Sequence, residues 1–309
     1  MTQSSVQSYF EYFQNYEKLV IQAATFIQSA ILKNNCEQPV FAITLGSGLG
    51  ELAQQITDAI SIPYNDIPNF PTTTVPGHEG TLIIGKLAGV PIIGLKGRKH
   101  FYEVAHEPFQ NGILKSVFAV HVMAELGISN YFVTNAAGGL NTSYSVGDIM
   151  ILQTHINFLP NVLLGPNKNF KRVGETSEVW RFQPMNEAYD KEYIAMLQKA
   201  GSEYKDHVHL GTYLAVTGPT FETEGECLAF RDGLGADCVG MSTTPEVIVA
   251  RNRNMKVVGF SCVTNTITNA GVNATNHEEV QKILNSEKIK ERLSKIVVNF
   301  FTEFGKVRD

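Results

Sequence analysis

The sequence predicts an α/β protein in which helices flank a mostly parallel or mixed central β-sheet. Short apolar runs recur along the 309 residues, and helical patterns fall between several of them. Several of the runs end in segments rich in Gly, Ser, Thr or Asn. Buried strands that alternate with helices are typical of this class, and ligands bind beyond the ends of such strands. We find no linker or repeat, and the length suits one large domain or two ordinary ones.

Each helix and strand is predicted from the spacing of its apolar residues. From about Val6 to Lys33, apolar residues recur at spacings of three or four, which predicts an amphipathic helix. The apolar run Pro39–Leu45 ends in glycines, which indicates a buried strand. Further strands are predicted at Leu82–Ile84, Pro91–Leu95, Tyr131–Thr134, Asp148–Leu152, Gly211–Val216, Asp237–Val239 and Val257–Val263. Helices are predicted at Pro108–Leu126, Ala188–Ala200, Glu222–Arg231 and Pro245–Arg253, with a long C-terminal helix capped by Asn276.

The composition excludes several classes of protein. The chain has 25 Lys and Arg against 30 Asp and Glu, for a net charge of −5, and 43% hydrophobic residues. Disorder needs low hydrophobicity and high net charge, and nucleic-acid binding needs clustered basic residues. No signal peptide or apolar run of roughly 20 residues is evident, and the four cysteines have neither CxxC nor zinc-ligand spacing. We expect a cytoplasmic protein without a membrane or nucleic-acid partner.

Two loop motifs offer hydrogen-bond donors to an anion. The segment Gly46–Gly50 follows a predicted strand and precedes a helical pattern, and Ser47 adds a hydroxyl to its backbone N–H groups. It is not a dinucleotide fingerprint, because Glu51 stands where the third glycine would be, and it lacks the Gly-Lys-Ser/Thr of a P-loop. His78 lies between glycines in Pro76–Gly80 and is expected to be accessible. A tight turn is the alternative for the first motif, and the second is weak when taken alone.

A third motif, Gly97–Tyr102, follows the strand predicted at Pro91–Leu95. Alternation places Arg98, His100 and Tyr102 on one side of an extended segment. An arginine fork with a histidine donor suits an oxyanion such as phosphate. The alternative is an exposed basic turn with a packed tyrosine.

Other motifs suit a sugar and a heterocycle. In Gly218–Thr223, Phe221 offers a stacking face and Glu222 can accept two N–H bonds. Asn265 is both donor and acceptor, which matches a purine Hoogsteen edge. The alternative for the first motif is a helix-initiating acidic turn.

Three remaining segments are less specific. Small residues in Thr134–Leu140 let a ligand lie against the backbone. After the strand that ends at Val239, Ser242 can donate to an anion and Met241 can pack on a sugar. His277 begins the last predicted helix. Turns and helix caps are the alternatives here.

Together these residues provide oxyanion donors, an apolar floor and a Glu/Asn pair for a base. No nucleophile elbow, glycosidase carboxylate pair or metal set is evident in the sequence. The phrases LGSGLG, VPGHEG, KGRKHFYE, VTNAAGGLN, VGDIM, GPTFET, VGMSTTPEVIVAR, VTN and NHEEV follow one another from Leu45 to Val280. In this order they resemble the trimeric, low-molecular-mass branch of the purine nucleoside phosphorylases.

The resemblance implies roles for individual residues. Phosphate would be held by Ser47, His78, Arg98, His100, Ser242 and the backbone at Ala136. Ribose would contact Tyr102, Met241 and His277, with Phe182 supplied by a neighbouring subunit. The base would be held by Phe221, Glu222, Val239, Thr264 and Asn265. Asn265, His100 and Glu222 are the expected catalytic residues.

The resemblance also implies an activity. This is the reversible phosphorolysis of purine ribonucleosides and 2'-deoxyribonucleosides, with inosine and guanosine preferred, to free base and (deoxy)ribose 1-phosphate in purine salvage. It implies a single domain over residues 1–309. It also implies a homotrimer with no metal or organic cofactor and with inorganic phosphate as co-substrate. The nearest alternative is a methylthioadenosine phosphorylase, for which we would expect an Asp near Asn265, where this chain has Thr264 and Thr266. A nucleoside hydrolase, an NAD-dependent dehydrogenase and a non-catalytic nucleoside-binding protein are further alternatives.

Overall fold

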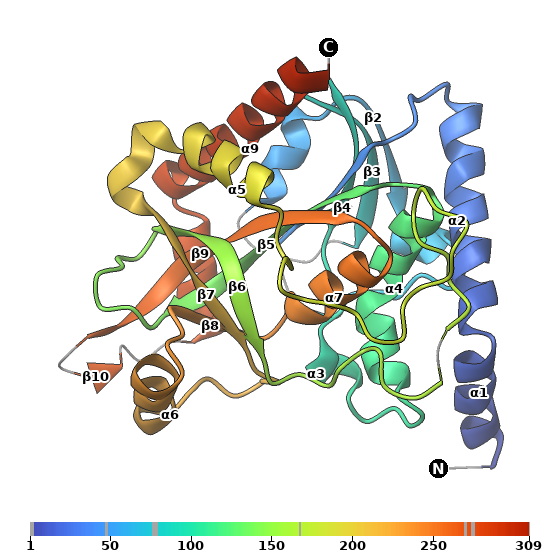
Figure 1. Cartoon of the computed structure of the whole chain (residues 1–309), viewed down its shortest axis with the longest axis horizontal. Helices are drawn as coiled ribbons and strands as arrows, with labels where there is room; N and C mark the ends of the chain where they lie inside the picture. The colour runs from blue at the N-terminus through green and yellow to red at the C-terminus, as the bar shows by residue number, and fades with distance from the viewer. Residues whose placement is uncertain are drawn as a thin grey trace.

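The computed structural model describes residues 3–46, 49–75, 80–166, 168–268, 271–272 and 276–308. Its centre is a mixed sheet of ten strands in the order β10-β9-β6-β7-β8-β5-β1-β4-β3-β2 (Figure 1). The predicted fold class, a single α/β domain with a mixed sheet, is confirmed. The strands are β1 Phe41–Leu45, β2 Thr57–Pro63, β3 Thr81–Leu87, β4 Val90–Lys96, β5 Asn130–Gly139, β6 Ile149–Asn157, β7 Val208–Ala215, β8 Cys238–Gly240, β9 Lys256–Thr268 and β10 Gly271–Val272.

Part of the sheet closes on itself. β9 pairs antiparallel with β6 and parallel with β5, so β5, β8, β7, β6 and β9 form a ring of paired strands. β4, β1, β5 and β9 run parallel to one another. Their carboxyl ends therefore meet at one edge, whereas the short β8 runs against β5 and brings Val239 opposite Gly138.

Helices cover the sheet on both sides. α5 (Lys191–Ala200) packs on α9 (Glu287–Arg308), and Figure 1 shows this pair above the strands. α4 (Asn111–Glu125) packs on α2 (Tyr16–Lys33) and α7 (Thr244–Asn252), with α4 and α7 below the strands in the same view. The remaining helices are α1 Gln3–Gln14, α3 Phe101–Val104, α6 Glu224–Leu228 and α8 His277–Leu284.

An aromatic cluster fixes α9 to the sheet. The ring centroids of Phe41 in β1 and Phe301 in α9 lie 5.2 Å apart, and those of Phe132 in β5 and Phe300 in α9 lie 5.0 Å apart. All four side chains are fully buried. Burying one such side chain contributes about 1.5–3 kcal/mol, so this cluster anchors the strand that carries part of the site.

The predicted helices at the two ends of the chain are each divided in two. The first breaks at Asn15, whose side-chain Nδ2 donates to the Glu11 carbonyl at 2.9 Å. Asparagine competes with helical hydrogen bonds in this way. The last breaks between α8 and α9 at Asn285 and Ser286. Asn276 caps α8 as predicted, because its Oδ1 accepts the Glu279 N–H at 2.9 Å.

Two strands lack a signal in the sequence. β2 lies at the end of the strand order and presents mostly exposed residues, so it has no apolar run. β10 is only two residues long. Both are peripheral to the predicted strands. Each predicted strand is found with somewhat different bounds; the first is shorter, Phe41–Leu45 against the predicted Pro39–Leu45.

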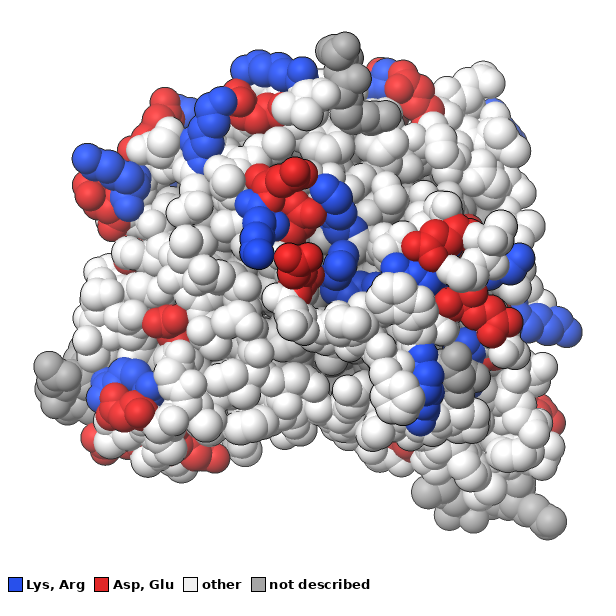
Figure 2. All heavy atoms as spheres, in the orientation of Figure 1, with Lys and Arg blue, Asp and Glu red and all other residues white. Residues whose placement is uncertain are grey.

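Positive and negative side chains are interspersed on the face shown in Figure 2. This pattern agrees with the absence of a basic run in the sequence. Among the helices that the structure describes, none combines the length and the apolar character needed to cross a bilayer.

Candidate active site

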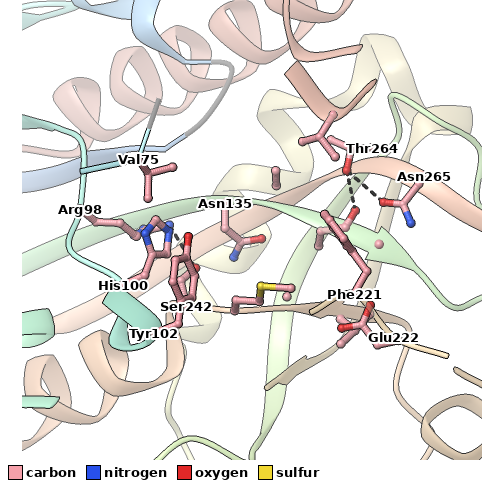
Figure 3. Close-up of a pocket in the computed structure, with 17 residues that line it drawn as sticks. Val75, Arg98, His100, Tyr102, Asn135, Phe221, Glu222, Ser242, Thr264 and Asn265 are labelled. Carbon is pink, nitrogen blue, oxygen red and sulfur yellow. Dashed lines mark hydrogen bonds between the residues drawn. The ribbon is translucent and has the colours of Figure 1, made fainter. Parts of the chain in front are cut away.

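A cavity of about 130 Å³ lies at the edge where the parallel strands end. β4 leads into it with Arg98 and His100, β5 contributes Ala136, and β9 contributes Asn265. Figure 3 shows the lining side chains in two groups, with Asn135 between them. One group holds Arg98, His100, Tyr102 and Ser242, and the other holds Phe221, Glu222, Thr264 and Asn265.

Arg98 is the central cation of the first group. Its Nη2 lies 3.2 Å from Glu246 Oε2 in an ion pair whose side chains are 5% and 8% exposed, and its Nη1 donates to Ser242 Oγ at 3.3 Å. Burial lowers the pKa of Arg98, but the Glu246 carboxylate, with smaller contributions from Tyr131 and Tyr213, raises that pKa above its usual value. The Tyr131 hydroxyl donates to Glu246 Oε1 at 3.1 Å and fixes this carboxylate from behind. The guanidinium is therefore always charged and has a defined orientation.

His100 and Tyr102 lie at the beginning of the short helix α3. The prediction of an extended segment is wrong beyond His100, because Phe101–Val104 forms α3 with His100 as its N-cap. The two rings instead stack at 5.0 Å with an interplanar angle of 12°. Glu103 accepts the His100 backbone N–H at 2.7 Å and lies 3.1 Å from His100 Nδ1. The Glu103 carboxylate accepts from Nδ1, so the His100 ring has a fixed orientation.

Glu103 is itself held as a carboxylate. Lys99 Nζ donates to its Oε2 at 3.0 Å, as does the Thr74 backbone N–H at 3.1 Å. Burial alone would raise the pKa of Glu103, but hydrogen bonds from His100, Thr74 and Lys99 lower it well below the usual range. Burial and the Glu103 charge raise the pKa of Tyr102 to about 12, so its hydroxyl is a neutral donor near neutral pH.

The second group sits on a turn after β7 and on the end of β9. Gly218 has φ +63°, and a Cβ there would lie 2.3 Å from Met241 Sδ, so a side chain is not tolerated at this position. The turn presents Phe221, which is 43% exposed, and Glu222. Burial raises the pKa of Glu222 above its usual value, and Glu226 adds to this effect.

Asn265 is oriented by its neighbours. Thr264 Oγ1 lies 3.2 Å from Asn265 Oδ1 and 3.3 Å from the Ala137 carbonyl, and Figure 3 marks the first contact. A hydroxyl bonded to Oδ1 leaves the Asn265 Nδ2 group as the available donor. A Cβ on Gly138 would lie 3.2 Å from that Nδ2, so glycine leaves room for the amide.

The loop after β1 differs from the expectation. The helical pattern after Gly46–Gly50 forms a 3₁₀ helix, Gly50–Gln55, and not an α-helix. One short helix of this kind has little dipole to offer an anion. Ser47 itself lies outside the described residues, as does His78 of the second loop.

Most of the other predicted site residues surround the cavity. These are Arg98, His100, Tyr102, Ala136, Phe221, Glu222, Val239, Met241, Ser242, Thr264 and Asn265. His277 is the first residue of α8. Phe182 is 88% exposed and lines a separate groove with Arg181 and His155.

Sequence reasoning missed three lining side chains. Asn135 lies inside a segment noted only for its small residues, and Val280 belongs to the apolar stripe of the long C-terminal helix that the sequence predicts. Val75 had no signal beyond its position beside the Pro76–Gly80 motif. Within the described residues, no group of three or more His, Cys, Asp or Glu has the geometry of a metal site.

Comparisons with known proteins agree with this geometry. The family model described as the phosphorylase superfamily matches residues 40–302. Purine nucleoside phosphorylase 1 of Bacillus subtilis is 42% identical over 89% of this chain and 95% of its own length. The purine nucleoside phosphorylase of Bos taurus is 44% identical over 81% of this chain and 84% of its own length.

Solved structures give the same result. A crystal structure of schistosoma purine nucleoside phosphorylase with hypoxanthine is 35% identical, with a TM-score of 0.77 over 90% of this chain and 95% of that chain. The chain therefore belongs to the purine nucleoside phosphorylase family within the phosphorylase superfamily.

Proposed function

We propose that this enzyme catalyses the reversible phosphorolysis of purine nucleosides at the cavity between its two groups of side chains. In this reaction the N9–C1' bond of the nucleoside breaks and a phosphate oxygen bonds to C1', which yields free purine and ribose 1-phosphate. The observation that carries the proposal is the pairing of a buried arginine with hydroxyl and imidazole groups on one side and a Glu/Asn pair on the other (Figure 3).

Phosphate is assigned to the first group. Arg98 and His100 would supply charge and N–H donors, Ser242 a hydroxyl, and Ala136 its backbone N–H. Ser47 and His78 would complete this site. The support is chemical: a buried guanidinium fixed by Glu246 suits a dianion, because its donors need no reorganisation when the anion enters.

The base is assigned to the second group. Phe221 would stack on the purine, and Val239 and Thr264 would line its pocket. The Glu222 carboxylate would accept N–H groups from one edge, and Asn265 would donate to N7. As the bond breaks, positive charge builds on the ribose and negative charge on the purine. Phosphate stabilises the first charge and Asn265 the second, which is electrostatic preorganisation.

The sugar is assigned to the space between the two groups. Tyr102 and Met241 line the cavity, and His277, the first residue of α8, is assigned to the ribose by resemblance. Phe182 would contribute to the site of a neighbouring subunit in a homotrimer. Its 88% exposure supports this, because a large apolar side chain in that state suits burial by a partner. A light-scattering mass equal to one 34.1 kDa chain would contradict the trimer.

The substrates are proposed to be 6-oxopurine ribonucleosides and 2'-deoxyribonucleosides, inosine and guanosine above others. Glu222 with Asn265 suits a purine that carries N1–H and O6. Schistosome relatives have been solved with inosine, guanosine and adenosine, so the family alone does not fix the preference. Faster turnover of methylthioadenosine than of inosine would assign the chain to the alternative activity.

We also propose that the enzyme works in the cytoplasm without a metal or organic cofactor and without a nucleic-acid or membrane partner. Each step of the proposed chemistry uses side chains and the co-substrate phosphate. Full activity after exhaustive dialysis against EDTA is the expected result. Loss of activity that Zn²⁺ or Mg²⁺ restores would contradict this part of the proposal.

The decisive experiment is base release from inosine, followed with and without inorganic phosphate. We expect hypoxanthine only when phosphate is present, with ribose 1-phosphate as the sugar product on chromatography. Release of hypoxanthine and free ribose without phosphate would show a hydrolase. Binding of nucleoside without any release would show a non-catalytic protein.

A further inference from the structure

Asn135 is a buried polar side chain at the centre of the cavity. It lies on β5 opposite Ser261 of β9, is 3% exposed, and projects between the two groups of side chains (Figure 3). Its Nδ2 donates to Thr243 Oγ1 at 2.9 Å, and its Oδ1 has no hydrogen-bond partner among the residues that the structure describes. A buried amide oxygen without a partner needs an explanation, since burying a polar group costs free energy unless it is hydrogen-bonded.

Its partner Thr243 has an uncommon backbone. Thr243 has φ +74° and ψ −56°, although β-branched residues avoid positive φ, and it is 1% exposed. The strained turn brings Thr243 Oγ1 to 3.0 Å from Ser242 Oγ. Ser242 Oγ in turn accepts Arg98 Nη1 at 3.3 Å. Asn135, Thr243, Ser242 and Arg98 therefore form one hydrogen-bonded series.

The direction of this series follows from the chemistry of its ends. An amide nitrogen and a guanidinium nitrogen can only donate. Thr243 Oγ1 must accept from Asn135, so its own proton is free to go to Ser242 Oγ. Ser242 Oγ then accepts from both Thr243 and Arg98. Its own proton is then left for an acceptor in the cavity that Ser242 lines.

We propose that Asn135 is a positioning residue that sets the direction of this hydroxyl relay, so that Ser242 presents its proton to a bound oxyanion. The inference rests on the proposed phosphate site and adds a residue that acts on that site through two others. Without the amide donor, Thr243 can turn its proton away from Ser242 or accept one from it. Ser242 would then offer a lone pair to the anion, which repels it.

A double-mutant cycle tests the relay. Asn135→Ala, Ser242→Ala and the double variant are compared with wild type for the Kd of inorganic phosphate by calorimetry and for the KM of phosphate. We expect Asn135→Ala to weaken phosphate about tenfold in wild type, as for loss of one hydrogen bond to an anion. In the Ser242→Ala background the same substitution should change phosphate affinity less than twofold, because groups in one network are not additive. Equal factors in both backgrounds, or no effect in wild type, would overturn the proposal.

Matched variants separate the relay from a packing effect. Thr244→Val removes a hydroxyl that donates to Asn157 Oδ1 at 2.5 Å, next to Thr243 in the chain but outside the relay, and should show no coupling to Asn135. Coupling as large as that of Ser242 would overturn the relay. Hypoxanthine affinity should stay within twofold of wild type in Asn135→Ala, whereas a general loss of both ligands would mean a structural role only.

Two further measurements keep the test decisive. If Asn135→Ala does not fold, Thr243→Val removes the hydroxyl but keeps the branched shape, and it should weaken phosphate to a similar extent. An unchanged phosphate Kd in Thr243→Val would contradict the relay. Wild type that releases base without phosphate would refute the proposed function itself, whereas additive effects in a phosphate-dependent wild type would refute only the role of Asn135.

Discussion

The two ends of the cavity are built differently. At the first end, which we call the rigid end, Arg98 forms an ion pair with Glu246, and His100 contacts Glu103. Ser242 is hydrogen-bonded to both Arg98 and Thr243. At the second, Phe221 is 43% exposed on a turn. Donors for an ion must be fixed in advance, because reorienting dipoles in a low-dielectric site offsets the gain. A planar ring can be recognised by stacking, which tolerates movement.

The largest effect is expected when the ion pair between Arg98 and Glu246 at the rigid end is broken. Arg98→Met would leave the buried Glu246 carboxylate without its guanidinium. Removing one partner of a buried ion pair costs about 3–5 kcal/mol. We expect the free energy of unfolding to fall by about that amount in urea titrations, and phosphate-dependent base release to be lost. A variant with wild-type stability would mean that the pair is much less tightly coupled than its burial indicates.

Next in size is a change at the leaving-group position of the other end. Asn265→Ala removes the donor proposed for N7 of the purine. Loss of one such donor lowers kcat by about 10²–10³. We expect this fall in single-turnover assays, with phosphate affinity unchanged because the rigid end is intact. A kcat near that of wild type would exclude Asn265 from leaving-group stabilisation.

A smaller effect is expected from pH. Glu222 accepts N–H groups only as a carboxylate, and its pKa is raised by burial. As pH falls through this raised pKa, Glu222 becomes protonated and base affinity declines. The KM for inosine should therefore begin to rise at a pH above the ordinary glutamate range. In Glu222→Gln the KM should be higher but flat across that range, and an acid limb that persists in this variant would assign it to another group.

The smallest effect is expected far from both ends. Lys191 and Glu187 form an exposed ion pair at 3.4 Å, with side chains 81% and 69% exposed. Exposed pairs of this kind contribute little. Lys191→Ala should leave the activity and the urea midpoint at wild-type values and serves as the control for the three changes above. A clear loss of activity would show that the surface around α5 matters for function.

The sequence predicted most of the sheet because buried strands leave apolar runs that do not depend on their partners. It missed β2, whose edge position exposes most of its residues. The predicted helices ran on through Asn15 and Asn285, because the spacing of apolar residues continues across these local breaks. Site motifs were visible where they follow strands. Contacts between residues distant in the sequence could not be predicted. Arg98 and Ser242 are 144 residues apart, and no local pattern links them. Nor does any pattern indicate that Thr243 has a positive φ.

The closed ring of strands has a dynamic consequence. β5 carries Asn135 and Ala136 and is hydrogen-bonded along its length to β9, with β1 and β8 on the other side. β9 pairs with β5 along its whole length, and β1 and β8 pair with its two ends, so neither end can fray without breaking two ladders. Its amide hydrogens should exchange with solvent only when the whole protein unfolds, whereas those of the turn that carries Phe221 should exchange quickly. The floor of the cavity would then be the part of the enzyme that opens last.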